Sequence, residues 1–257
     1  MTAYFRRTGA TAYTATDHTR GAWSADDQHV APSLGLLTHL VEADRDARRD
    51  DGLVLGRLSF DILGTMPVAE LETTTRVVRP GRTIELVEAT LVHAGRAVVV
   101  LRAWLLEPRD TAEHAGTHHA SLPAPDTWEV WRPSSLWDGA FLGSVEVRRD
   151  LAAPGRGRAW ARTTLPVVDD ADTSPLTRAA SVWDVANGMA VRADPARVAF
   201  PNLDLTAHLH RQPRGEWVGF DTTVSFGGDG LGLTSSVLHD ADGPVGTSAQ
   251  VLTVRPF

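Results

Sequence analysis

The sequence lacks cysteine altogether, since none of its 257 residues is one. Disulfides, thiolate nucleophiles and cysteine-ligated metal sites are therefore excluded. Long apolar runs are missing too, because no stretch approaches the ~20 residues that span a bilayer. The N-terminal residues MTAYFRRTGATAYTATD lack the apolar core of a signal peptide. We therefore expect a cytoplasmic protein that does not insert into a membrane.

An excess of positive charge is also absent. Lys and Arg number 25 against 32 Asp and Glu, which gives a formal net charge of −7 at pH 7. Proteins that bind nucleic acid normally present a basic face, so we predict no nucleic-acid partner. A small anionic ligand stays compatible with this charge, because a few local Arg side chains suffice to hold one.

Several catalytic and cofactor motifs are missing. No GxSxG nucleophile elbow occurs, and the Gly-rich stretch GGDGLG (227–232) has neither the spacing of a dinucleotide fingerprint nor a helix after it. His114, His118 and His119 lie in a segment rich in Gly and Ala, without carboxylates in a nearby regular element. A solvated loop explains these histidines more simply than a metal site does. We predict no cofactor and no metal.

What the chain does contain is an internal repeat. The stretch SFDILGTMP (59–67) reappears as LTAHLHRQP (205–213), an offset of 146 residues (205 − 59). The same offset relates Arg79 to Ser225 in the segments that follow. A repeat of about half the chain predicts two similar halves that pack together.

Each half contains one segment with helical periodicity. The first helix is expected to open at Pro32 and Ser33 and to give way to a solvated, charged stretch at residues 44–52. The second is expected to open at Ser174 and Pro175, an N-cap and first-turn pair, and to stop at Asn187-Gly188. The apolar positions that define the buried faces are Leu36, Leu37, Leu40 and Val41 in the first helix and Leu176, Ala179, Ala180 and Trp183 in the second.

The remaining segments read as strands separated by turns. One helix followed by a mainly sequential antiparallel sheet in each half predicts an α+β fold, in which each sheet curls around its helix. That arrangement is the hotdog, and two tandem copies make a double hotdog. We predict an N-terminal hotdog at residues 1–110, a linker at 111–134 and a C-terminal hotdog at 135–257.

Three segments of the second half resemble a known family. They are FPNLDLTAHLHRQPRGEW (200–217), GGDGLG (227–232) and DGPVGTSAQVLTVRP (242–256). Their order and spacing resemble the C-terminal half of double-hotdog acyl-CoA thioesterases of the thioesterase II type. The first half, with LSFDILGTMP (58–67), is similar to the N-terminal hotdog of actinobacterial members.

The resemblance implies an active site in which an Asp, a hydroxyl and a Gln hold the hydrolytic water. On this sequence it assigns Asp204 in the LD pair, Ser225 in place of the commoner Thr, and Gln250 in TSAQ. Asp204 is expected to act as the general base, while Ser225 and Gln250 fix the water. Backbone N–H groups at the start of either helix are candidates for the oxyanion site. Direct attack by Asp204, through an anhydride, stays open.

The repeat itself checks this assignment. Leu58 stands where Asp204 stands, and Arg79 stands where Ser225 stands. Counted from the final turn, Arg102 corresponds to Gln250. The first copy therefore lacks the acid, the hydroxyl and the amide, so only the second half is expected to host the chemistry.

Strand alternation gives two interpretations of the polar residues. Asp204, Thr206, His208 and His210 share one face of a predicted strand. Taken alone, alternation favours solvent exposure of that face, whereas the resemblance favours a groove between the two hotdogs. Asp184 and Asn187 lie near the end of the second helix, where members of the family often carry polar residues. Capping explains Asn187 without chemistry.

We therefore predict an acyl-CoA thioesterase whose substrate is an acyl-CoA or related acyl-thioester. Two alternatives stay open: a catalytically silent double hotdog that binds an acyl-thioester, and an enoyl-thioester hydratase. The second is disfavoured because the predicted helix LTRAASVWDVANGMA (176–190) lacks a His. A homo-oligomer is expected, since hotdog sheets expose faces and edges that pack against partners.

Overall fold

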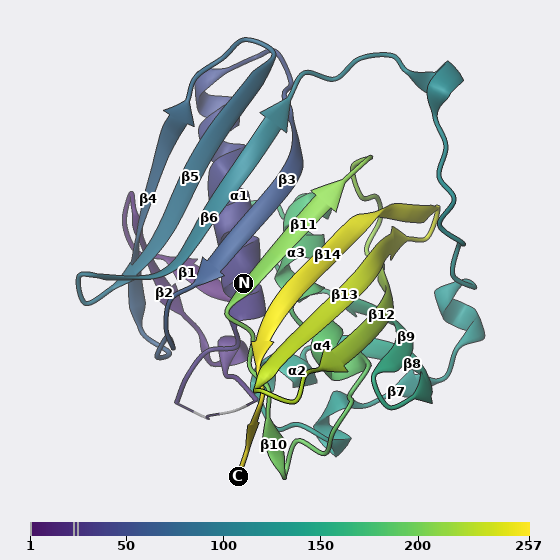
Figure 1. Ribbon diagram of the computed structural model, residues 1–257. Helices are drawn as coiled ribbons and strands as arrows, with labels where there is room; N and C mark the ends of the chain where they lie inside the picture. Colours follow the sequence, from purple (N-terminus) through teal and green to yellow (C-terminus); the bar gives the residue numbers. More distant parts are fainter. Residues whose placement is uncertain (1, 23, 25) are drawn as a thin grey trace.

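The computed structural model describes residues 2–22, 24 and 26–257. Within these residues its main feature is one antiparallel sheet of 13 strands, in which six strands of the first half continue into seven of the second (Figure 1). From the outer edge inward, the first-half strands are β1 (Phe5–Arg7), β2 (Ala12–Ala15), β4 (Glu70–Arg79), β5 (Ile84–His93), β6 (Arg96–Leu106) and β3 (Val54–Ile62). From the centre outward, the second-half strands are β11 (Asp204–Leu209), β14 (Gly243–Thr253), β13 (Leu231–Asp240), β12 (Val218–Phe226), β9 (Arg156–Thr163), β8 (Val145–Ala153) and β7 (Val130–Trp131).

The two halves meet where β3 pairs with β11. Ser59 lies opposite Thr206, and Phe60 lies opposite Leu205. The Ser59 and Thr206 hydroxyl oxygens are 2.9 Å apart across this junction. Because the sequence repeat relates Ser59 to Leu205, equivalent residues nearly face each other here. A pseudo-twofold axis therefore passes between the two strands at this point, as expected for a double hotdog.

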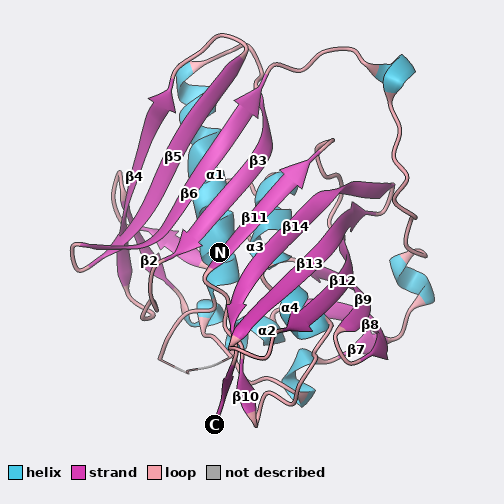
Figure 2. Ribbon diagram, in the orientation of Figure 1, coloured by secondary structure: helices cyan, strands magenta, loops and turns pink. Residues whose placement is uncertain are grey.

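Two helices lie together on the inner side of the sheet (Figure 2). They are α1 (Val30–Arg48) and α3 (Pro175–Trp183), and the apolar faces predicted from the sequence are buried except at Leu40, which is partly buried. The helices cross closely at Gly35, where an added Cβ would lie 2.7 Å from the Cβ of Ser181. Two further short helices, α2 (Ala140–Gly143) and α4 (Ala186–Met189), lie on the same side of the sheet (Figure 2).

The start of α3 is fixed to α1 by hydrogen bonds. Ser174 is the N-cap, as predicted, and its hydroxyl accepts from the backbone N–H of Thr177 at 3.0 Å. The Ser174 and Thr177 hydroxyls then donate to Oε2 of Glu42 on α1, at 2.6 and 2.8 Å. These bonds set the position of α3, and hence of the residues at its end, relative to the first half.

The helix boundaries differ from the prediction at three points. Helix α1 begins at Val30 rather than at Pro32, because His29 acts as its N-cap through Nδ1. It also continues to Arg48, where an ion pair with Asp44 one turn earlier supports the last turn. Helix α3 stops at Trp183, and α4 forms a separate turn.

Residues 107–129 run along the outside of the molecule between the halves and contain only the short 3₁₀ turns η2 (Ala112–His114) and η3 (Pro125–Thr127) (Figure 1). Two more such turns, η1 (Asp17–Thr19) and η4 (Pro133–Ser135), and a small sheet of β10 (Val198–Ala199) with β15 (Arg255–Pro256) complete the described elements. The division at residues 110 and 135 stays a prediction. None of the helices in the described residues has the length and apolarity needed to cross a membrane.

Candidate active site

The structure does not bring Asp204, Ser225 and Gln250 together. Gln250 is only 1% exposed and points to the helix side of the sheet, opposite Thr234. Ser225 is exposed on β12, opposite the exposed Leu233. Strand alternation therefore places Ser225 on the opposite face of the sheet from Gln250.

Asp204 lies on the same outer face as Ser225. The next residue, Leu205, is fully buried, so the Asp204 side chain points away from the helices. Its Oδ1 accepts a 2.6 Å hydrogen bond from the backbone N–H of Val251. This contact ties the start of β11 to β14, and on this outer face Asp204 is half-buried while Ser225 is exposed.

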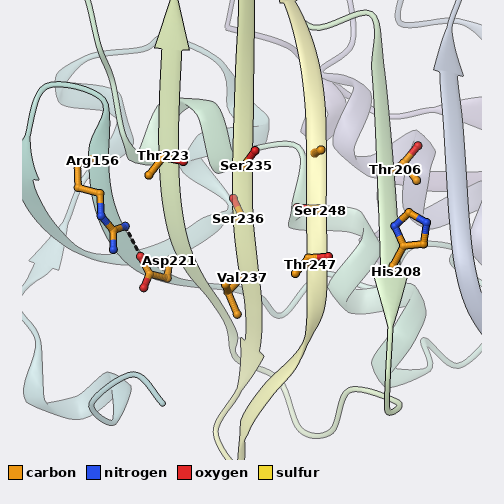
Figure 3. A pocket seen from close by; sticks show the side chains of 11 residues that line it. Arg156, Thr206, His208, Asp221, Thr223, Ser235, Ser236, Val237, Thr247 and Ser248 are labelled. Atoms are coloured by element: carbon orange, nitrogen blue, oxygen red, sulfur yellow. Dashed lines mark hydrogen bonds and ion pairs between the residues drawn. The ribbon is translucent and has the colours of Figure 1, made fainter. Parts of the chain in front are cut away.

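A shallow hollow covers this outer face of the second half (Figure 3). It is lined by small hydroxyl side chains, the exposed His208 and the ion pair of Arg156 with Asp221. Gln250 is not part of its lining. The hollow therefore lacks the acid–amide set that the resemblance implies.

On the inner face, Gln250 contacts Asp184. Its Nε2 donates to Asp184 Oδ1 at 3.0 Å, and the Asn202 Nδ2 donates to the same oxygen at 2.6 Å. The three residues come from the end of α3, from the segment before β11 and from β14. The chain therefore does build one acid with two amides, but with Asp184 and Asn202 in the places that the prediction gave to Asp204 and Ser225.

Asp184 is held in an unfavourable place for an ionised carboxylate. It is the C-cap of α3, where the helix dipole disfavours negative charge, and it is 5% exposed. Burial raises the pKa of Asp184 to about 7, while the hydrogen bonds from Asn202 and Gln250 act in the opposite direction. A buried acid with a pKa near neutrality is the property that general-base chemistry requires.

His29, the N-cap of α1, lies beside this carboxylate. Its Nδ1 is 3.7 Å from Asp184 Oδ2. Burial lowers the pKa of His29 to about 4, so the ring is neutral at pH 7. The contact is therefore not an ion pair, and Asp184 keeps its raised pKa.

Asp184, Asn202 and His29 line a cavity of about 300 Å³ between the halves. The first half supplies Gln28, Val30 and the turn at residues 62–66, while the second supplies residues 201–203. None of the described residues that line the cavity is an Arg. The acid and the two amides come from the second half, and the first half builds the opposite wall of the cavity.

The sequence carried a signal for Asp184. It follows the buried Leu176 and Ala180 at intervals of four residues, which places it on the buried stripe of the helix. An acid on such a stripe needs an explanation other than solvation. Asn202 carried no comparable signal, because it precedes its strand and its contact with Asp184 depends on the tertiary fold. In the described residues no cluster of three or more His, Asp or Glu is placed to hold a metal ion.

Comparisons with known proteins agree with this architecture. A family model described as the acyl-CoA thioesterase C-terminal domain matches residues 116–254, and one described as the N-terminal domain matches residues 19–106. No curated protein matches the chain.

Solved structures match over nearly the full length. The acyl-CoA thioesterase II TesB2 from Mycobacterium marinum is 17% identical, with a TM-score of 0.69 over 98% of this chain and 96% of that one. A hot dog fold protein of unknown function from Alicyclobacillus acidocaldarius is 14% identical, with a TM-score of 0.76 over 97% and 95%. The tesB protein of Mycobacterium avium subs paratuberculosis is 17% identical, with a TM-score of 0.68 over 98% and 96%. These structures share the fold, and the matches to both domain models show that the chain belongs to the acyl-CoA thioesterase family.

Proposed function

We propose that the protein hydrolyses an acyl-CoA thioester to the free acid and CoA, with Asp184 as the general base. The observation that carries this proposal is the buried Asp184 carboxylate, whose pKa is raised to about 7 and whose Oδ1 is held by two amide donors. Those donors leave Oδ2 as the oxygen available to a water in the cavity.

Gln250 supplies a second contact for that water. Its Nε2 is used by Asp184, while its Oε1 is buried with no hydrogen-bond partner among the described residues. A buried acceptor without a partner costs about 1–3 kcal/mol, and a water held between Oε1 and Asp184 Oδ2 removes that cost. The nucleophile is then bound by two oxygens that both accept its protons.

The reaction needs little more than this water and a site for the oxyanion. Asp184 takes a proton from the water as its oxygen bonds to the carbonyl carbon, and the carbon–sulfur bond then breaks. The sulfur leaves as a thiolate, whose thiol has a pKa of roughly 8.5, so no strong acid is required. The backbone N–H of Val30, at the start of α1 and in the cavity wall, is a donor for the oxyanion.

The cavity favours an uncharged acyl group. Val30, Ile62, Met66 and Leu203 give it apolar walls, and its described lining contains no Arg that could pair with a carboxylate on the acyl chain. Asp184 would also repel such a carboxylate once ionised. We therefore expect a medium-length or branched, apolar acyl chain to be preferred over a dicarboxylic one.

Two comparisons of variants test the proposal. Release of free thiol is measured with a panel of acyl-CoA compounds, for the wild type, Asp184→Asn and Asp204→Asn. We expect Asp184→Asn to lower kcat by at least about 10²-fold, because the amide cannot take a proton, and Asp204→Asn to stay near the wild type. An inactive Asp204→Asn variant beside an active Asp184→Asn variant would instead support the site suggested by the motif.

The enoyl-thioester hydratase gains one observation in its favour. The second helix lacks a His, but His29 of the first half lies 3.7 Å from Asp184. Two observations count against the hydratase. His29 Nδ1 already accepts a hydrogen bond from the backbone N–H of Ala31, and the pKa of His29 is lowered to about 4, so His29 is a poor base. Water addition to an enoyl-CoA without thiol release would support the hydratase. Tight binding of an acyl-CoA without either reaction would support the catalytically silent double hotdog.

We also propose a cytoplasmic homo-oligomer. Leu231, Leu233 and Val251 are exposed on the outer face at the end of the sheet, where a second copy would cover them. The mass of the protein in solution tests this, and a monomer at all concentrations would contradict it.

A further inference from the structure

The side chain of His29 has no role in the water-activating set, although it lies in the same cavity. Resting on the proposed hydrolysis, we propose that neutral His29 donates a hydrogen bond from Nε2 to the carbonyl oxygen of the thioester. His29 is then a catalytic residue that supplements the start of α1 in holding the oxyanion.

The tautomer follows from the helix cap. The backbone N–H of Ala31 donates to His29 Nδ1 at 3.2 Å. A ring nitrogen that accepts a hydrogen bond carries no proton, so in the neutral ring the proton lies on Nε2. Burial lowers the pKa of the ring to about 4, which keeps it neutral at the pH where Asp184 is ionised. His29 therefore presents one N–H donor and no positive charge.

The ring is held in place on one side and open on the other. It stacks at a tilt against Phe141, with 4.4 Å between ring centroids, and its side chain remains 13% exposed. None of the described residues hydrogen-bonds to Nε2, and this atom is not fully buried. The donor is therefore accessible to a ligand.

Its surroundings place that ligand at the reaction centre. His29 lines both the cavity that contains Asp184 and a smaller one, of about 30 Å³, that is walled by Trp137, Leu142 and Met189. A thioester attacked by a water on Asp184 Oδ2 must lie within a few ångströms of this ring, because Nδ1 is 3.7 Å from the same oxygen. The carbonyl oxygen is then within reach of Nε2.

A neutral donor suits this position. As water adds to the carbonyl carbon, the carbonyl oxygen gains negative charge and strengthens its bond to Nε2–H, and it releases that bond when the carbon–sulfur bond breaks. No proton is transferred to or from His29. A charged imidazolium would instead pair with Asp184 and lower the pKa of the base.

Two substitutions separate this role from the capping role. His29→Asn places an amide oxygen where Nδ1 accepts from Ala31, but it removes the donor at Nε2. His29→Gln places an amide N–H near Nε2, but it removes the cap. The wild type must first release thiol from an acyl-CoA, so failure of the proposed function is recognised before either variant is measured.

We expect His29→Asn to keep the thermal unfolding midpoint and to lose about 10²–10³-fold in kcat. His29→Gln should unfold at a lower temperature but keep kcat within about tenfold of the wild type, since it restores a donor at the same place. The acid limb of the pH profile near 7, set by Asp184, should persist in both. The proposal is overturned by a His29→Asn variant with wild-type kcat, by a folded His29→Gln variant as inactive as His29→Asn, or by loss of the acid limb, which would make His29 the base.

Discussion

The Asn202 amide donates at 2.6 Å to Oδ1 of Asp184 and at 3.1 Å to the backbone oxygen of Asp204. Both of its donor positions are therefore used, and the amide orientation is fixed by the backbone of β11. This arrangement connects the acid at the end of α3 to the first residue of the central strand. The position of the carboxylate is thus determined by the sheet as well as by its own helix.

Replacing Asn202 is expected to shift the pH dependence of hydrolysis. A hydrogen bond to a carboxylate favours its ionised form, so loss of the Asn202 donor raises the pKa of Asp184 above its value of about 7. For Asn202→Ala we expect the acid limb of kcat/KM to move to higher pH. Asn202→Thr keeps a hydroxyl donor and should move the limb less. An acid limb unchanged in both variants would show that Asp184 is not the titrating base.

Much of the fold follows from the sequence because it depends on local signals. The repeat offset predicted that residues near Ser59 and Leu205 are equivalent, and they meet at the junction of the halves. Ser174 caps α3 as expected, because the cap depends on a residue only three positions away. The charged run at 44–52 was less predictable, since its helical part is supported by contact of Arg48 with the distant Glu85.

The site was only partly predictable, for a different physical reason. Alternation placed Asp204 on a polar face but cannot say whether that face meets solvent or a cavity. Gln250 was predicted, and it lies beside the acid. The identity of that acid depends on Asp184, Asn202 and Gln250 meeting across separations of 18 and 66 residues, which no local pattern encodes.

Asp184 is also expected to destabilise the fold above pH 4. Its pKa rises from 3.8 to about 7 on folding, so the folded state keeps a proton that the unfolded state has lost between these values. Stability conferred by the protonated group is complete below pH 3.8 and is lost as the pH rises to about 7. Asp184→Asn should therefore gain stability over the wild type, by roughly 2–4 kcal/mol at pH 8.

Denaturant unfolding of both proteins from pH 4 to pH 8 measures this difference. The difference in unfolding free energy between Asp184→Asn and the wild type should grow between pH 4 and 7 and then stay constant. A difference in unfolding free energy that is the same at pH 4 and pH 8 would mean that burial does not shift the pKa of Asp184.

The crossing of α1 and α3 is expected to depend on Gly35. An added Cβ would lie 2.7 Å from the Cβ of Ser181, so Gly35→Ala must push the helices apart, at a typical overpacking cost of about 1–3 kcal/mol. The better helix propensity of Ala offsets about 1 kcal/mol of this. Because Asp184 directly follows α3, kcat should fall together with stability.

Ser181→Gly removes the opposing Cβ and provides the control. The double variant Gly35→Ala/Ser181→Gly should therefore be more stable, and have a higher kcat, than the sum of the two single changes predicts. Strict additivity in a double-mutant cycle of unfolding free energies would contradict the close approach of the two helices.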